Sequence, residues 1–469
     1  MKPVGWGLLA GIAAGGAVAY ASRGPTLVHW PERVRMAFPF VLGGLVGATT
    51  ATKVGVSVSV LRAATGRGPG PVTTITPVVV GSAALAGAVV AGRIASHRLL
   101  GKLTQTGRDL DDGFAAPPST SDVTAGPGSL LTVDELGREG ARFVGTVTSP
   151  DDVRQVTGRD PIASPIRVFV GFDSAGTVEQ RVGLAMAELR RTGAFERSHL
   201  LIQAPAGTGY ANPTPVDVLE VLTEGDCASV AIGYGLLPSF LSLNKVEIAG
   251  RTQKLLLDSI HAELQALQRR PRLLLYGESL GAKVQQAAMP FGPADLDYYG
   301  IDGALYVGTP GSKAADDFHL LCSEESIVID RPSLIPAGLA APAIGTADEV
   351  VPRPRVWFLE HDGDPVVRFR PEVLWSRPVW LPTDGTRGRN VPESMVWRPG
   401  ITWAQALVDT LFATDVKPGD FQSMGHDYRA DLGGTVPAAY RLAANEGTLA
   451  RLEDFLRAKE IARAAQISS

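Results

Sequence analysis

One stretch decides the fold of this chain: Arg272-Leu273-Leu274-Leu275-Tyr276-Gly277-Glu278-Ser279-Leu280-Gly281. It is an apolar run that ends in a Gly-x-Ser-x-Gly turn, and a helix-like segment at residues 282–289 follows it. A buried strand, a tight turn and a helix in this order form a nucleophile elbow, because the two glycines allow the turn and the close packing of strand against helix. The pattern therefore predicts that Ser279 lies exposed at the tip of the turn, above the N-terminus of the next helix.

Strands and helices alternate on both sides of this stretch. We expect further apolar strands at residues 166–172, 199–204, 228–234, 301–308 and 355–360, and helices at residues 178–191, 216–223 and 243–267. Near-continuous apolar strands separated by helices indicate a mostly parallel sheet with helices on both faces. Such sheets place their active sites at the carboxyl ends of the strands, where the elbow also lies.

A serine at an elbow needs a base to take its proton, and the base needs an acid to fix its tautomer. In an α/β-hydrolase fold these residues follow one another along the chain as serine, acid and histidine. Three histidines follow Ser279, namely His319, His361 and His426. His426 is the predicted base, because residues 423–428 form a glycine-flanked loop near the C-terminus. His361 directly follows a predicted strand and ranks second, and His319 ranks last.

The acid is expected on the loop that follows the predicted strand at residues 355–360. Asp364 lies on this loop and is followed by a proline and two β-branched residues, so we predict that Asp364 is the acid. Asp362, two residues earlier, is the alternative.

An oxyanion hole requires one backbone N–H from the residue after the nucleophile and another from the loop after an earlier strand. Leu280 supplies the first N–H. The glycine-rich loop that contains Thr208 and Gly209 is the preferred source of the second, and the loop that contains Asp173 and Ser174 is the alternative.

The first hundred residues differ from the rest of the chain. Charge-free stretches rich in Ala, Gly, Val and Leu occupy residues 4–21, 36–52 and 72–92, and their lengths suit helices that cross a bilayer. The first stretch could also be a signal peptide, but two more apolar stretches follow it. We therefore predict about three transmembrane helices within residues 1–100 and a multi-pass protein of the cell membrane. The flanking lysines and arginines slightly favour a cytoplasmic C-terminal domain.

A polar segment at residues 101–129, rich in Pro, Gly, Ser, Thr and Asp, predicts a flexible linker, because it holds too little apolar surface to fold alone. The catalytic domain is then expected at residues 130–469. Residues 311–351 lie where such folds insert a cap, and their apolar stretch at residues 334–342 could cover an acyl chain; an ordinary surface excursion is the alternative.

The composition and the motifs argue against several classes of partner and cofactor. The formal net charge is -4, which gives no basic field for nucleic acid. The two cysteines, Cys227 and Cys322, match neither a metal-ligand spacing nor a disulfide framework. Because the sequence contains no phosphate loop and no dinucleotide fingerprint, we expect no metal and no cofactor.

The chain resembles the actinobacterial family of membrane-anchored α/β-hydrolases that have a polytopic N-terminal region. The resemblance extends over residues 130–440, and its matching segments lie at residues 136–144, 170–175, 193–197, 207–210, 277–281, 364–367 and 425–428. It implies an α/β-hydrolase fold preceded by an all-α transmembrane region, and it implies a serine esterase type of activity.

Residues and resemblance together predict a membrane-tethered serine hydrolase that cleaves an acyl ester or thioester, with a lipid or another small acyl ester as its substrate. An acyltransferase with the same triad is one alternative, since it differs only in what resolves the acyl-enzyme. A non-catalytic membrane scaffold that keeps the fold is the other alternative.

Overall fold

The computed structural model describes residues 25–30, 105–236, 246–343, 354–413 and 419–468. The chain divides into two compact units, one made of residues 1–102 and 370–412 and a larger one made of residues 103–369 and 413–469. The transmembrane helices predicted at residues 4–21, 36–52 and 72–92 lie outside the described residues. Within the described ranges, no helix is both long enough and apolar enough to cross a membrane.

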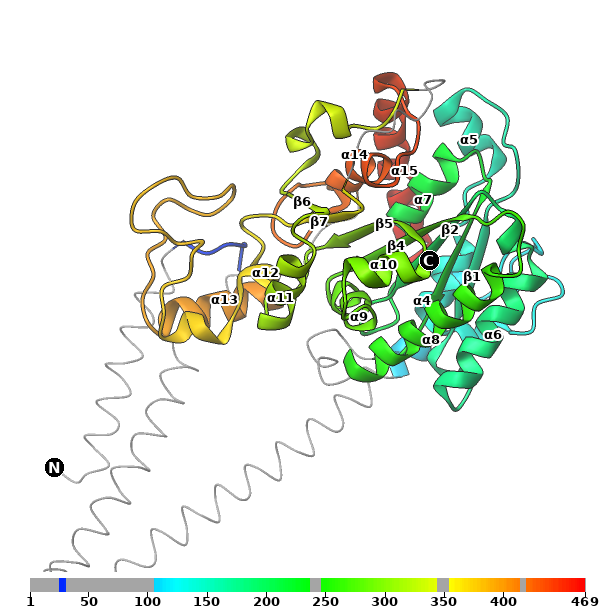
Figure 1. The fold of residues 1–469 in the computed structure, drawn as a ribbon, viewed down its shortest axis with the longest axis horizontal. Coiled ribbons are helices and arrows are strands. Elements are labelled where there is room, and N and C mark those ends of the chain that lie inside the picture. The colour runs from blue at the N-terminus through cyan, green and yellow to red at the C-terminus, as the bar shows by residue number, and fades with distance from the viewer. Residues whose placement is uncertain (1–24, 31–104, 237–245, 344–353, 414–418, 469) are drawn as a thin grey trace, which may run out of the picture. The chain divides into compact units, whose positions relative to one another are not determined.

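A seven-stranded sheet forms the centre of the larger unit, and every neighbouring pair of its strands is parallel (Figure 1). The strand order is β1-β3-β2-β4-β5-β7-β6. The strands are β1 (Ile166–Val170), β2 (His199–Ala204), β3 (Cys227–Ile232), β4 (Arg272–Glu278), β5 (Ile301–Val307), β6 (Ser326–Ile329) and β7 (Val356–Leu359). The elbow strand β4 therefore lies in the middle of the sheet, between β2 and β5. Of these strands, only β6 was not predicted from the sequence.

Helices cover both faces of the sheet, as the apolar strands predict (Figure 1). One face carries α6 (Val178–Arg191), α8 (Val246–Leu264) and α9 (Leu280–Ala288), and the other carries α5 (Pro150–Thr157), α7 (Pro213–Leu222), α14 (Arg429–Tyr440) and α15 (Glu446–Ser468). The remaining helices of the larger unit are α4 (Val133–Gly145), α10 (Pro293–Tyr299), α11 (Lys313–Leu321) and α12 (Pro365–Arg368).

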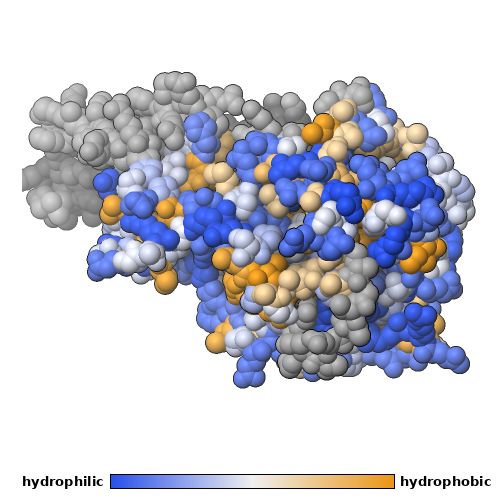
Figure 2. Space-filling view, turned by 90° about the horizontal axis from the view of Figure 1, so that it is seen from above, coloured by the Kyte–Doolittle hydropathy of each residue, from blue (hydrophilic) through white to orange (hydrophobic). Residues whose placement is uncertain are grey.

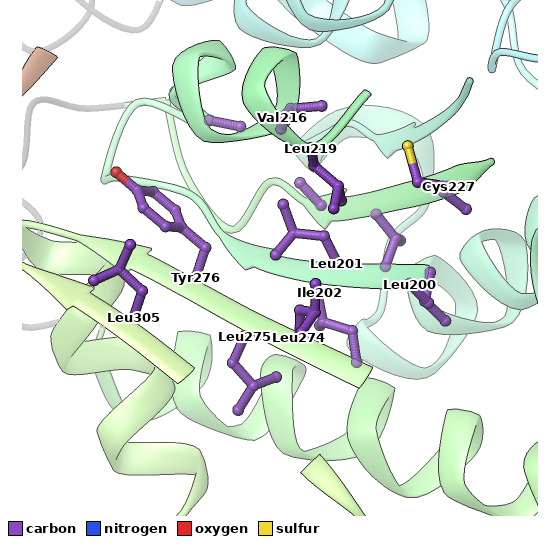
Figure 3. Packing of buried hydrophobic residues seen from close by; sticks show 14 of the residues in the cluster. Leu200, Leu201, Ile202, Val216, Leu219, Cys227, Leu274, Leu275, Tyr276 and Leu305 are labelled. Atoms are coloured by element: carbon purple, nitrogen blue, oxygen red, sulfur yellow. The ribbon is translucent and has the colours of Figure 1, made fainter. Parts of the chain in front are cut away.

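The core lies between the sheet and these helices. Leu219 of α7 points toward Leu201 of β2, whereas Leu275 of β4 lies on the opposite side of the sheet (Figure 3). All three side chains are inaccessible to solvent, and burying a leucine stabilises a fold by about 1.5–3 kcal/mol. The face in Figure 2 is mostly hydrophilic, with apolar patches between the hydrophilic residues. Single exposed apolar side chains, such as Phe291, are normal on the surface of a folded protein.

The predicted linker at residues 101–129 is not wholly a free tether in the structure. Val123 is fully buried and forms a bridge with Arg167 of β1, and the Thr124 N–H donates to the Arg167 carbonyl at 3.1 Å. Phe114, in the short helix η1 (Asp112–Phe114), is also buried. The segment is too polar to fold alone, but its few apolar side chains pack against the larger unit.

The segment predicted as a cap, residues 311–351, contributes instead to the sheet. It forms α11 and the edge strand β6, which pairs with β7. Residues 344–353 lie outside the described ranges. Because a strand at a sheet edge needs only one neighbour, the four residues of β6, three of which are Ile or Val, are enough to add it.

The sequence predicts one catalytic domain at residues 130–469, but residues 370–412 belong to the smaller unit. This segment contains η8 (Pro371–Leu374) and α13 (Ile401–Leu411). Asp409 of α13 accepts hydrogen bonds from the Leu27 N–H at 3.1 Å and from the Trp30 indole N–H at 2.5 Å. These contacts join residues that are more than 370 positions apart, which no local pattern reveals.

Candidate active site

Ser279 lies on the turn between β4 and α9 with φ 54° and ψ -125°. A non-glycine residue with positive φ carries backbone strain of about 1–3 kcal/mol and usually marks a functional position. Its backbone N–H donates to the Val307 carbonyl at the end of β5, at 2.9 Å. A Cβ atom at Gly277 would lie 2.7 Å from the Cα of Ala282, so the close approach of strand and helix requires glycine there.

His426 and Asp364 form a buried pair near this turn. Asp364 follows β7 and caps α12, where its Oδ1 accepts the Val366 N–H at 2.8 Å. The Nδ1 atom of His426 lies 2.7 Å from Asp364 Oδ2, so Nδ1–H donates to the carboxylate. Burial lowers the pKa of His426, but the charge and hydrogen bond of Asp364 outweigh burial and raise this pKa above its ordinary value.

The end of β5 lies next to both His426 and Ser279. Val307 accepts the Ser279 N–H, and a Cβ atom on the next residue, Gly308, would lie 2.8 Å from His426 Cε1. Among the residues that the structure describes, the buried Nε2 of His426 has no hydrogen-bond partner. An imidazole with one nitrogen fixed by a carboxylate and the other unpaired has the form of a general base.

The other two histidines have different surroundings. The Nδ1 of His361 lies 2.9 Å from the Gly425 carbonyl oxygen, and its Nε2 lies 2.9 Å from Asp431 Oδ2, so both ring nitrogens have partners. His319 stacks on Phe358 of β7 with a 3.7 Å centroid distance. The structure thus brings the ring of His426, and not the ring of His361 or His319, into contact with the Asp364 carboxylate.

Asp362 contacts Arg368 and Asp330, and not His426. Its Oδ1 pairs with the Arg368 guanidinium at 3.3 Å, and its backbone N–H donates to Asp330 Oδ1 at 3.0 Å. The side chain is 41% exposed, in contrast to the fully buried Asp364.

The preferred oxyanion loop follows β2, the direct neighbour of β4 in the sheet. Leu280 begins α9, and the next residue, Gly281, packs against the Ala204 carbonyl at the start of this loop. The Gly209 N–H donates to the Ala206 carbonyl at 2.9 Å, so that N–H is used within the loop. Thr208 Oγ1 accepts the Tyr210 N–H at 3.3 Å.

The alternative loop follows β1, which β3 and β2 separate from β4. There Asp173 pairs with Arg108 at 2.6 Å, and the Ser174 hydroxyl donates to the Glu135 carbonyl at 2.9 Å. These contacts hold the loop against α4 and its preceding segment.

The sequence did not reveal three hydrogen bonds that hold the site residues in place. Glu278 Oε2 accepts hydrogen bonds from Asn212 Nδ2 at 2.5 Å and from the Tyr276 hydroxyl at 2.6 Å, which ties the elbow to the start of α7. The Tyr428 hydroxyl donates to Asp364 Oδ2 at 2.6 Å. The Asn-Pro pair at residues 212–213 signals a helix start, but no local signal identifies its partner.

Within the described part of the chain, no group of three or more His, Cys, Asp or Glu residues is arranged to hold a metal. Cys227 and Cys322 are buried free thiols, and burial raises the pKa of Cys322 to about 11. Both cysteines therefore stay protonated at neutral pH, as small apolar side chains of the core.

A parallel sheet with an elbow at the end of its central strand, and a histidine paired with an acid from a later strand, define the class of the α/β-hydrolases. Residues 166–448, more than half of the chain, match the model of the alpha/beta-hydrolase family, so the chain belongs to this family. The family indicates a hydrolase-type enzyme. No curated protein and no solved structure matches the chain.

Proposed function

We propose that this protein is a serine hydrolase that cleaves an acyl ester or thioester through Ser279, His426 and Asp364. One observation carries the proposal: His426 holds Asp364 through Nδ1, while its unpaired Nε2 lies in the part of the molecule where the Ser279 turn is anchored. This is the arrangement in which an imidazole can take a proton from a serine.

The reaction would proceed through an acyl-enzyme. Ser279 Oγ attacks the substrate carbonyl while His426 Nε2 takes the hydroxyl proton. The tetrahedral intermediate collapses, and His426 returns that proton to the leaving oxygen or sulfur. Water then attacks the acyl-enzyme with His426 again as the base. Asp364 holds the imidazole in the required tautomer and stabilises its positive charge.

For the acid, burial and direct contact favour Asp364 over Asp362. A buried carboxylate interacts more strongly with an imidazolium than an exposed one, because less water screens the charges. The ion pair of Asp362 with Arg368 gives that residue a structural role on the same loop.

For the oxyanion hole we assign the N–H groups of Leu280 and Thr208. The loop of Thr208 and Gly209 follows the strand next to the elbow, whereas Asp173 and Ser174 follow the edge strand. Thr208 is preferred to Gly209 because the Gly209 N–H is already bonded within the loop. Removing one such donor typically lowers kcat about 10²- to 10³-fold.

Labelling with a fluorophosphonate probe tests the triad. The parent protein is expected to react, Ser279→Ala to lose the label, and Ser376→Ala, which removes an exposed serine in the smaller unit, to keep it. Labelling of Ser279→Ala at the parent rate would refute the proposal. A series of esters with increasing acyl length would then measure the size of the acyl pocket.

We also propose that the protein is anchored in the cell membrane, with its catalytic domain in the cytoplasm and with lipids or lipid-like acyl esters as substrates. Support comes from the sequence alone, in the charge-free stretches at residues 4–21, 36–52 and 72–92. Both native cysteines are buried, so Ser469→Cys gives a selective probe of sidedness. An impermeant thiol reagent should label it only after the cells are opened, and labelling of intact cells would refute the cytoplasmic assignment.

A further inference from the structure

A second histidine–carboxylate pair lies beside the proposed triad. His361, two residues after β7, is completely buried and contacts Asp431 in the first turn of α14 at 2.9 Å. The second oxygen of Asp431 accepts the Ser423 hydroxyl at 2.9 Å. Thus Asp431 fixes both the His361 ring and the start of the loop that carries His426.

His361 also holds the backbone of that loop. Its Nδ1–H donates to the carbonyl oxygen of Gly425, the residue directly before His426, at 2.9 Å. The Asp431 carboxylate and the Gly425 carbonyl oxygen are both acceptors, so the two hydrogen bonds together require a proton on each ring nitrogen, and the negative charge of Asp431 stabilises such an imidazolium. The peptide that leads into His426 is thereby tied to the strand that leads into Asp364.

Tyr428 connects the two pairs. Its ring stacks on the His361 ring with a 4.1 Å centroid distance, and it lies nearly perpendicular to the His426 ring at a centroid distance of 5.7 Å. The hydroxyl accepts the His361 backbone N–H at 3.1 Å and donates to Asp364 Oδ2 at 2.6 Å. Burial raises the pKa of Tyr428 well above its ordinary value, so the hydroxyl keeps its proton and continues to donate.

We propose that His361 and Tyr428 are positioning residues for the triad: His361, oriented by Asp431, fixes the Gly425 peptide and with it His426, while Tyr428 fixes Asp364. This inference rests on the proposed function of Ser279, His426 and Asp364. Neither positioning residue reaches the reacting atoms. Both hold the base and the acid in the correct position relative to each other. A displacement of about 1 Å in such groups lowers the rate by up to about 100-fold.

Substitutions at His361 separate its two contacts. His361→Asn keeps a donor near the position of Nδ1, whereas His361→Gln keeps one near the position of Nε2. We expect His361→Ala to lower kcat about 10- to 100-fold with KM within twofold of the parent, since the residue does not touch substrate. Because the contact with Gly425 is the one that fixes His426, His361→Asn should recover more of kcat than His361→Gln.

Tyr428→Phe removes only the hydroxyl. A hydrogen bond to a charged group is lost, so kcat should fall about tenfold, again without a change in KM. Leu264→Ala, a loss of packing in α8 on the other face of the sheet, is the control for destabilisation alone: its Tm should fall while kcat per active site is retained.

All rates are expressed per active site, counted by fluorophosphonate labelling of the full chain. If the parent does not label at Ser279, the proposed function itself fails. If the parent labels and turns over substrate but His361→Ala and Tyr428→Phe retain its kcat, the positioning roles are refuted. Equal recovery by His361→Asn and His361→Gln would refute the specific role of the Gly425 contact.

Discussion

His426 Nδ1 lies 2.7 Å from Asp364 Oδ2, although 62 positions separate the two residues along the chain. Residues 370–412, which belong to the smaller unit, intervene between them in the sequence. The acid and the base are therefore supplied from the two sides of an insertion. Their contact depends on the sheet and on α14, which bring the two ends of the insertion together.

Asp364→Asn should lower kcat about 10³- to 10⁴-fold, because the amide favours the wrong tautomer of His426 and cannot stabilise its positive charge. Asp362→Asn should leave kcat within twofold, because its partner is Arg368. Steady-state kinetics of both variants measures the difference. A comparable loss in the two variants would show that Asp364 is not the specific acid.

The pH dependence of kcat/KM should reflect the raised pKa of His426. The base must be neutral to accept the serine proton, so activity is lost as pH falls through this pKa. Because Asp364 raises the pKa, the acid limb should lie above the ordinary histidine value of 6.5. In Asp364→Asn, the acid limb of the pH profile, measured on its residual activity, should move to lower pH. An acid limb at the parent position would contradict the role of Asp364 in raising the pKa of His426.

The strain at Ser279 predicts a difference between two inactive variants. Both Ser279→Gly and Ser279→Ala lose the nucleophile, but only glycine adopts φ 54° without a steric cost from Cβ. We expect Ser279→Gly to be more stable than Ser279→Ala by about 1 kcal/mol in thermal or urea unfolding. Equal stability would mean that the turn relaxes when the hydroxyl is removed.

A buried ion network gives a prediction for stability. Arg167 of β1 is fully buried and pairs with Asp217 and Glu220 of α7, each at 2.6 Å. Arg167→Met leaves part of this carboxylate charge uncompensated in the core, and we expect a loss of about 3–5 kcal/mol in the free energy of unfolding. Arg154→Met, which breaks exposed pairs, should leave the free energy of unfolding nearly unchanged, because water screens these charges.

The same network should also affect how the stability of the protein depends on pH. Burial raises the pKa of Asp217, but the charges of Lys459, Arg463 and Arg167 outweigh it and hold this pKa well below its ordinary range. A depressed pKa contributes stability above the unfolded value that is lost as pH falls through the folded value. Acid unfolding of Asp217→Asn should therefore show a weaker pH dependence than that of the parent. An identical dependence would exclude Asp217 as a contributor.

Much of the fold could be predicted from local patterns in the sequence. The apolar run at residues 272–276 and its glycines predicted the elbow, and similar runs predicted every strand except β6. Such runs are readable because a strand buried on both faces needs apolar side chains at nearly every position. The strand β6 has only four residues, so its apolar run of three is too short to be recognised as a strand from the sequence alone.

The order of residues along the chain suggested which residues form the site. It could not show which of their side chains meet in the folded protein. The sequence allowed Asp362 as well as Asp364 as the acid, and any of three histidines as the base, since all of them satisfy the required order along the chain. Their different environments arise from packing: Asp362 meets Arg368, while Asp364 meets His426 and Tyr428.

The sequence by itself determined the parallel α/β architecture and the elbow at Ser279, because both depend on neighbours along the chain. Only the tertiary structure decided that Asp364 meets His426, that His361 and Asp431 hold the neighbouring backbone, and that residues 370–412 join residues 25–30 in a separate unit. These contacts link residues far apart in sequence, and their geometry depends on how the sheet and its covering helices pack.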